Sequence, residues 1–200
     1  GENWDDLPRI AAGDSFDFAC AGCGGCCRGR RDLVLSGYDL YRIARRLGLS
    51  PRIVAGAFCK SYLAPQTLLP ALRLTPDPRT GNCRFFEGSA CAIHAARPLA
   101  SALYPLGRSI DPVTAKIEYY VQTALCGART DGGRVLNDYL TDAAILDRAG
   151  IDARWAVVCT RLSEQLHAAA DHPHVAAGVK GVERALYYHY QLGDDFYPQF

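Results

Sequence analysis

Four cysteines near the N-terminus carry the clearest chemical signal in the sequence. Cys20, Cys23, Cys26 and Cys27 fall in the stretch FACAGCGGCCRGRR. Two-residue gaps let thiolates converge from a turn onto one metal ion or cluster, as in zinc ribbons and bacterial ferredoxins. Cys26 and Cys27 are not expected to bond to each other, because adjacent Cα atoms lie about 3.8 Å apart and an ordinary disulfide needs about 4.4–6.8 Å. The spacing predicts a metal centre, with metal-free buried or redox thiols as the alternative.

A second group of potential ligands lies further along the chain. Cys83 and Cys91 are followed by His94, and the gap between Cys91 and His94 suits a pair of ligands. Cys126 follows a predicted strand, from which it could return to the same centre. We therefore expect Cys83, Cys91 and Cys126 to join the leading cysteines. His94 either binds the metal or packs beside its ligands.

Arginines follow both cysteine groups. Arg28, Arg30 and Arg31 come directly after the cysteine doublet, and Arg97 precedes Pro98. One interpretation of the first three is a solvated basic turn. The other is that they offset the negative charge of a thiolate-ligated cluster or bind an anionic substrate. Arg97 can donate several hydrogen bonds around the centre, so Arg28 and Arg97 are the candidate cofactor-binding residues.

The bulk composition is that of an ordinary globular protein. The chain has 200 residues, of which 49% are hydrophobic and 22% charged, and a formal net charge of +1. This balance favours neither a nucleic-acid nor a membrane partner. No apolar run reaches the roughly 18 residues of a membrane span, and no signal peptide is visible. Nine cysteines are an odd number, which argues against a disulfide framework. We expect a reducing, cytoplasmic environment and a protein or small-molecule substrate of unknown identity.

Local signals predict the elements that would position these residues. Ser36 and Asp39 form a capping-box pattern before a helix that ends at Gly48. A second helix begins after Ser50 and is expected to run to about Tyr62. Three β elements are then expected: a strand at 72–74, a hairpin over 81–98 and a strand over 115–124.

The last third of the chain reads as helical. Beyond the TDGG turn at 130–133, apolar residues recur at helical spacing in three stripes. The chain therefore divides into an N-terminal arm (1–14), a cysteine-cluster region (15–128) and a helical part (133–192) packed on it as one domain. We expect a mostly helical α+β fold around a cysteine-rich loop core that holds the metal. Cys159 falls in a stripe and is expected to be buried, whereas Cys59 is either a core residue or a ligand or redox partner.

Several motifs, in the same order, resemble a known family. FACAGCGGCCRG, LSGYDLYRIARRLGLS, NCRFFEGSACAIHAARP and the YP at 104–105 are similar to the CxxCxxCC zinc- or iron-chelating family of YkgJ-like cysteine-cluster proteins. We expect a bacterial protein. The resemblance covers roughly residues 17–128. It implies that the family's metal-binding cysteines are Cys20, Cys23, Cys26, Cys27, Cys83, Cys91 and Cys126. An iron–sulfur cluster of the [4Fe–4S] type is the expected cofactor, with other iron or zinc ions as the alternative.

One family position is changed in this chain. The family usually continues RPxxCRxYP, whereas this sequence reads RPLASALYP, so Ser101 replaces the expected cysteine and Ala102 the expected arginine. The change leaves either an open coordination position, a gap filled by His94, Cys59 or Ser101, or a chain that has lost part of the family's chemistry.

Several functions are compatible with these features. The first is a chemically active metal centre, in redox or group transfer, with an open site near Ser101. The second is a structural zinc module that serves binding. A weaker one is a methyltransferase, because flagellin lysine N-methylases resemble one branch of the family and are associated with an iron–sulfur centre. Those proteins are longer, and no glycine-rich nucleotide-binding fingerprint follows a strand here. A metal-free thiol redox sensor is a further alternative, and the sequence does not decide whether the chain is an enzyme.

Overall fold

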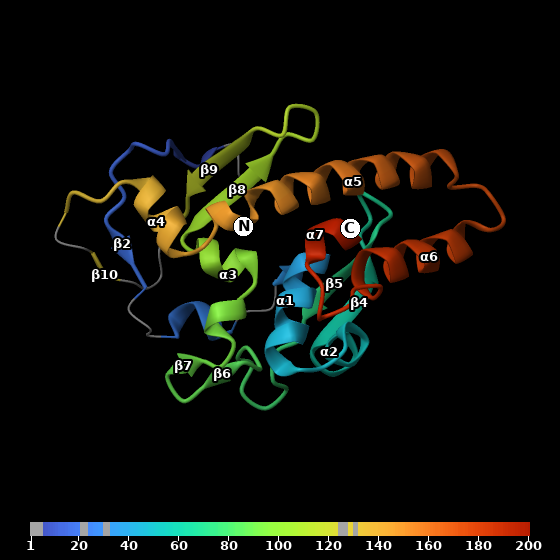
Figure 1. Cartoon of the computed structure of the whole chain (residues 1–200), viewed down its shortest axis with the longest axis horizontal. Helices are drawn as coiled ribbons and strands as arrows, with labels where there is room; N and C mark the ends of the chain where they lie inside the picture. The colour runs from blue at the N-terminus through green and yellow to red at the C-terminus, as the bar shows by residue number, and fades with distance from the viewer. Residues whose placement is uncertain (1–5, 21–23, 30–32, 124–127, 130–131) are drawn as a thin grey trace.

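The computed structural model describes residues 6–20, 24–29, 33–123, 128–129 and 132–200, and only the backbone at positions 26, 128 and 129. These residues form helices and small sheets (Figure 1), which confirms the predicted α+β class. Every strand pair in the described part is antiparallel. Three of these pairs, β4–β5, β6–β7 and β8–β9, join strands that are consecutive in the chain, as a short connection permits.

One sheet lies in the largest core. Its strands, in spatial order, are β3 (Val34–Leu35), β5 (Pro70–Leu74) and β4 (Cys59–Leu63). Two helices, α1 (Gly37–Leu47) and α2 (Pro51–Phe58), pack beside this sheet. Leu35, Ile43, Val54 and Leu72 are almost completely buried there, and each such side chain contributes about 1.5–3 kcal/mol by leaving water.

The predicted start and end of α1 are confirmed. The Ser36 hydroxyl accepts a hydrogen bond from the Asp39 amide at 3.1 Å, and the Asp39 carboxylate accepts one from the Ser36 amide at 3.1 Å. These two bonds satisfy amide groups that have no partner inside the helix. Gly48 ends the helix with φ at 66°, a left-handed conformation that suits glycine.

The second helix is shorter than predicted. It begins as expected, with the Ser50 hydroxyl accepting a bond from the Ile53 amide, but it ends at Phe58 rather than near Tyr62. Cys59 instead begins β4, so its predicted place within a helix is wrong. The physical reason is the neighbouring strand: β4 pairs with β5 along its whole length, and this pairing supplies the backbone hydrogen bonds that a helix would have made.

A second sheet joins the N-terminal arm to the middle of the chain. Its strands, in spatial order, are β1 (Arg9–Ile10), β9 (Ile117–Val121) and β8 (Leu106–Ile110). β9 confirms the strand predicted over 115–124, and β1 shows that the arm is docked through a strand. Two further helices, α3 (Leu99–Leu103) and α4 (Leu136–Asp142), contribute Leu103 and Leu136 to the core beside this sheet.

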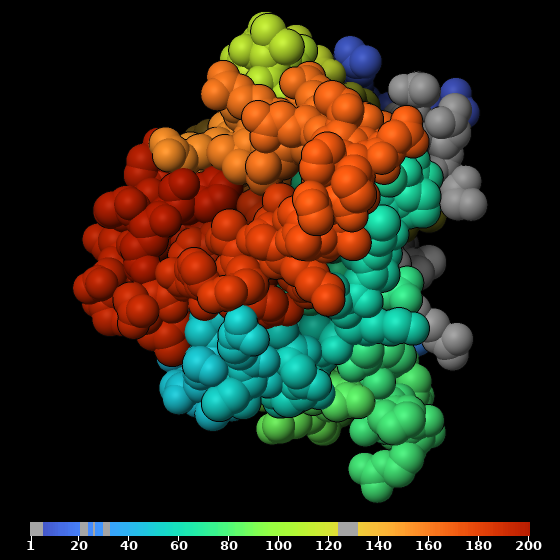
Figure 2. Space-filling view, turned by 90° about the vertical axis from the view of Figure 1, so that its right-hand side faces the viewer, coloured from blue at the N-terminus to red at the C-terminus, as the bar shows by residue number. Residues whose placement is uncertain are grey.

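The last third of the described chain is helical, as predicted. It comprises a 3-10 turn (Leu146–Arg148), α5 (Ala149–Ala168), α6 (Val175–Tyr187) and the short α7 (Phe196–Gln199). α5 and α6 extend to the same end of the molecule, where a loop joins them (Figure 1), and Figure 2 shows that end face-on. Among the described helices, including the 20-residue α5, none combines the length and apolar sequence needed to cross a membrane.

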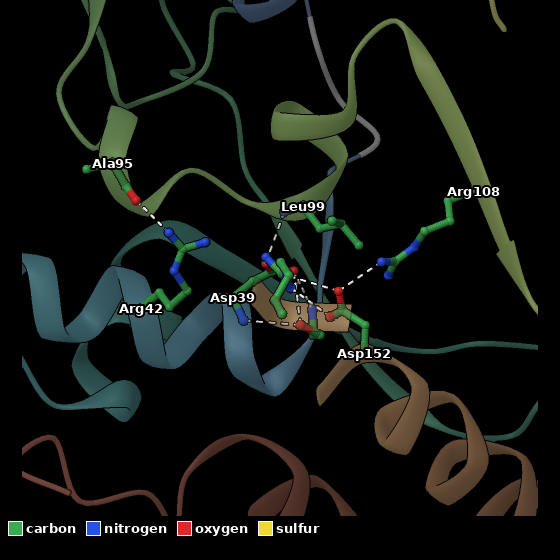
Figure 3. Close-up of polar contacts among 8 residues, drawn as sticks. Asp39, Arg42, Ala95, Leu99, Arg108 and Asp152 are labelled. Atoms are coloured by element: carbon green, nitrogen blue, oxygen red, sulfur yellow. Dashed lines mark hydrogen bonds and ion pairs between the residues drawn. The ribbon is translucent and has the colours of Figure 1, made fainter. Parts of the chain in front are cut away.

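A buried network of charges joins this helical part to α1 (Figure 3). Arg148 is 2% exposed, and its guanidinium bonds to Asp39 Oδ1 at 2.8 Å and to both oxygens of Asp152 at 2.9 and 3.0 Å. Arg108, from β8, donates to Asp152 Oδ2 at 2.9 Å. The Leu99 amide at the start of α3 donates to Asp39 Oδ1 at 3.0 Å. Burial disfavours the charge of Arg148, but the two aspartates outweigh burial and raise its pKa.

Candidate metal centre

The leading cysteines lie around a tight turn. β2 (Phe18–Ala19) pairs with β10 (Ala128–Arg129), and Cys20 follows β2 directly. A 3-10 turn, Gly25–Cys27, then carries the cysteine doublet. Cys23 and Cys126 lie outside the described residues, as does the side chain of Cys26.

Gly24 allows this turn to approach a neighbouring hairpin closely. Its φ is 69°, and a Cβ placed on it would lie 2.2 Å from Cε2 of Phe86. No side chain fits such a distance, so only glycine permits the approach. The close contact holds the leading cysteine segment against the segment that carries the second cysteine group.

The second cysteine group is attached to the first through the backbone. The Cys83 amide donates to the Cys27 carbonyl at 2.9 Å. The predicted hairpin is present, because β6 (Phe86–Glu87) pairs with β7 (Ala90–Cys91) and Cys91 lies opposite Phe86. Two regions that are far apart in the sequence are thus adjacent in space.

A pocket of about 180 Å³ lies between these segments. Cys20, Cys27, Cys83 and Cys91 all line it, and these are the predicted ligands whose side chains the structure describes. Within the described residues, no three histidine, cysteine, aspartate or glutamate side chains form a group that could hold an ion. The ligand set therefore stays a prediction, while the donor chemistry of the wall, with soft sulfur atoms, suits zinc and iron–sulfur centres.

Ser101 also lies on this pocket. It belongs to α3, is half-buried, and lines the wall together with Ala102. The Ser101 amide donates to the Pro98 carbonyl at 2.9 Å, which fixes the backbone. The residue that departs from the expected cysteine is thus on the same pocket as the cysteines that remain.

The two candidate cofactor-binding arginines differ in place. Arg97 lines the pocket, and its Nη1 lies 2.6 Å from Nε2 of His94, a nitrogen that can only accept from a guanidinium. Burial, followed by the charge of Arg97, lowers the pKa of His94. Arg28 is exposed and lies over the ring of Phe86, with its guanidinium carbon 5.2 Å from the ring centroid. It covers a wall residue rather than the pocket itself, and Arg30 and Arg31 lie outside the described residues.

A family model matches residues 19–127, more than half of the chain. The chain belongs to the CxxCxxCC family. The family is described as "Putative zinc- or iron-chelating domain", which confirms the resemblance found in the sequence. No curated protein and no solved structure matches the chain. All seven predicted ligands fall inside the CxxCxxCC match, whereas Arg148 and Asp152 fall outside it.

Two cysteines of this CxxCxxCC protein lie away from the pocket wall. Cys59 and Cys159 pack in or beside other parts of the interior and do not line the cysteine pocket. Burial raises the pKa of each thiol to about 12, so both are protonated at neutral pH. They behave as small apolar side chains, which is what the helical stripe predicts for Cys159.

The aromatic wall of the pocket is the feature that sequence reasoning missed. The Tyr139 hydroxyl donates to the carbonyls of Ala102 and Tyr104 at 3.0 and 2.6 Å, and so holds the end of α3 in place. Phe18 packs edge-on against both tyrosine rings at centroid distances of 6.1 and 6.0 Å. Tyr104 belongs to the YP motif, which is a signal that the sequence contains for this wall. Tyr139 lies beyond the CxxCxxCC match, and no motif marks it.

Proposed function

We propose that this protein holds an iron–sulfur cluster of the [4Fe–4S] type. Its ligands would come from Cys20, Cys23, Cys26 and Cys27, with help from Cys83, Cys91 and Cys126. The observation that carries the proposal is the common pocket: every predicted ligand with a described side chain lines it. The C-x2-C-x2-C rhythm favours iron–sulfur over zinc, and the family description is compatible with either metal.

The pocket wall supports a chemically active centre. Ser101 replaces a thiolate ligand with a hydroxyl, which is a poorer ligand for a soft metal. A metal with one open position can bind a substrate or take part in redox or group-transfer chemistry, whereas a closed site is structural. Arg97 lies on the same wall and provides positive charge to offset a thiolate-ligated cluster or to bind an anionic substrate.

Metal analysis of anaerobically purified protein tests the proposal. We expect iron and acid-labile sulfide, about four of each per cluster, and broad absorption near about 400 nm. A colourless protein that contains one or two zinc ions per chain would overturn the iron–sulfur assignment and support a structural zinc module instead.

A pair of cysteine variants tests whether the cysteines of the pocket wall are the metal ligands. Cys27→Ala removes a thiol from the pocket wall, and Cys159→Ala removes one that lies elsewhere. We expect Cys27→Ala to lose most of the iron per folded chain and Cys159→Ala to retain it. Equal iron content in the two variants would contradict the ligand assignment.

A further inference from the structure

A second and larger pocket lies on the other side of α3. Its volume is about 630 Å³, within the range of about 300–1,000 Å³ that is usual for small-molecule sites. Ser101 and Ala102 face the cysteine pocket, whereas Leu99, Ala100 and Leu103 of the same helix face this one. The two pockets are therefore separated by one short helix, whose place among β8, α1 and α5 is visible in Figure 1.

Most of the wall of this pocket is apolar. The wall is built by β3, the first turn of α1, β5, α3, β8, α5 and the end of α6. Representative wall residues are Leu35, Leu69, Leu103, Ile110, Trp155 and Ala156. Three α5 residues on this wall, Trp155, Ala156 and Cys159, are half-buried. Such a surface favours the hydrocarbon part of a ligand.

The polar part of the wall is the charge network of Figure 3. Asp39, Asp152 and Arg108 all line the pocket. Asp39 accepts bonds from Arg148, Leu99 and Ser36, and Asp152 accepts three from the two arginines. The carboxylates are therefore largely occupied by donors that the protein itself supplies.

Arg108 keeps donor capacity for a ligand. Its side chain is 6% exposed, and Nη1 donates to Asp152. The Tyr119 hydroxyl also interacts with the guanidinium. A guanidinium has five N–H donors, so these contacts use only part of it. Asp39 and Asp152 each lie in the first turn of a helix, where the helix dipole offsets part of their negative charge. Arg108 and Arg148 together balance the charge of Asp39 and Asp152, so a ligand carboxylate would bind through the N–H donors of Arg108 that these contacts leave unused.

We propose that this pocket binds an apolar carboxylate, a small molecule whose hydrocarbon body lies along Trp155 and the leucine wall. Its carboxylate accepts hydrogen bonds from the Arg108 guanidinium, the pairing for which planar arginine is best suited. An amine of the same size should bind more weakly, because Asp39 and Asp152 already accept hydrogen bonds from groups of the protein. The proposal goes beyond the metal centre and does not depend on which metal the cysteines bind.

Titration of the purified 200-residue chain with decanoate tests the class of ligand. The chain has two tryptophans, so a Trp4→Phe background makes Trp155 on the pocket wall the fluorescent reporter. We expect a saturable fluorescence change with decanoate and at least tenfold weaker binding of decylamine and decanol. Equal affinity for the three probes, or no saturable binding of decanoate, would overturn the proposal.

Matched variants on α5 test the location. Ala156→Leu fills the pocket, whereas Ala168→Leu makes the same change at an exposed position of the same helix outside it. We expect Ala156→Leu to weaken decanoate binding at least tenfold and Ala168→Leu to leave it unchanged. Equal binding by both would overturn the site. The comparison of the three probes needs no variant in the pocket, so it decides the proposal even where Ala156→Leu folds poorly.

Discussion

Ser101 carries a hydroxyl oxygen at the position where the family pattern RPxxCRxYP has a cysteine sulfur. A serine hydroxyl does not ionise near neutral pH, whereas a cysteine thiol loses its proton readily at a metal. The side chain lies on the pocket that four cysteines line, and in the proposed centre it offers a hydroxyl where the resemblance implies a thiolate. Ala102, buried beside it, removes the expected arginine at the same time.

Restoring the cysteine should alter the centre. We expect Ser101→Cys to raise the metal content per chain or to change the visible spectrum, because it adds a thiolate where the wall has a hydroxyl. Ser109→Cys makes the same change on β8 at an exposed position outside the pocket and should leave both unchanged. The idea of an open position at Ser101 fails where metal content, spectrum and any activity are the same in Ser101→Cys and wild type.

At the scale of elements, two glycines allow the effect of backbone strain to be separated from the effect of a close contact. Gly24 and Gly29 both have positive φ, 69° and 65°, so alanine is strained at either. Only Gly24 also faces Phe86; a Cβ at Gly29 would meet no atom of the described residues within 4 Å. Comparison of the two substitutions therefore isolates the packing of the cysteine turn on the hairpin.

Gly24→Ala should be more harmful than Gly29→Ala. We expect it to lower the free energy of unfolding by about 1–3 kcal/mol more, since overpacking adds to the backbone strain, and to reduce bound metal. Urea unfolding and metal analysis of both variants measure the difference. Similar losses in the two would show that the approach to Phe86 does not matter.

A second element-scale contrast compares a buried ion pair with an exposed one. Arg148→Met leaves buried Asp39 without an arginine and buried Asp152 with Arg108 alone, and it should lower the free energy of unfolding by about 3–5 kcal/mol. Arg134→Met removes an arginine that pairs with a largely exposed Asp142 and should lower it by less than about 1 kcal/mol. Urea denaturation measures both, and equal costs would refute the structural role of Arg148.

At the scale of the whole molecule, several buried acids share one pH response. Burial raises the pKa of Cys59 and Cys159 to about 12, and it raises the pKa of Tyr187 and Tyr190 as well. In the unfolded chain a thiol loses its proton near about pH 8.5, while the folded protein still retains it. The unfolded state therefore binds fewer protons above that pH, and stability falls as pH rises.

The free energy of unfolding should be insensitive to these thiols below about pH 8 and should fall between about pH 9 and 12. Each group contributes at most about 1.4 kcal/mol per pH unit. Urea unfolding of wild type and Cys159→Ala from pH 7 to 11 provides the measurement. The variant should show the shallower decline, and an identical decline would mean that Cys159 titrates as it does in the unfolded chain.

Short-range signals were the ones that the sequence conveyed correctly. The hydrogen bonds of Ser36 and Asp39 join residues three apart, and the β6–β7 hairpin is equally local. β8 was missed because LGRSI shows no alternation and forms a strand only by pairing with β9. The Arg148–Asp39 bond joins residues 109 positions apart, so no local sequence pattern predicts it. The cysteine spacing predicted which residues lie together, and the four predicted ligands with described side chains line one pocket. Their coordination of a metal remains a prediction.

The shared core has a consequence for the boundaries of the family. The CxxCxxCC match stops at residue 127, yet Leu35 and Leu72 are buried in one cluster with Leu186 and Tyr187. A fragment that ended at the match would expose that leucine face to water and leave Asp39 without Arg148. In this protein the cysteine segment therefore depends on the later helices for part of its core, and we expect a fragment that ends at residue 127 to be less stable than the whole chain.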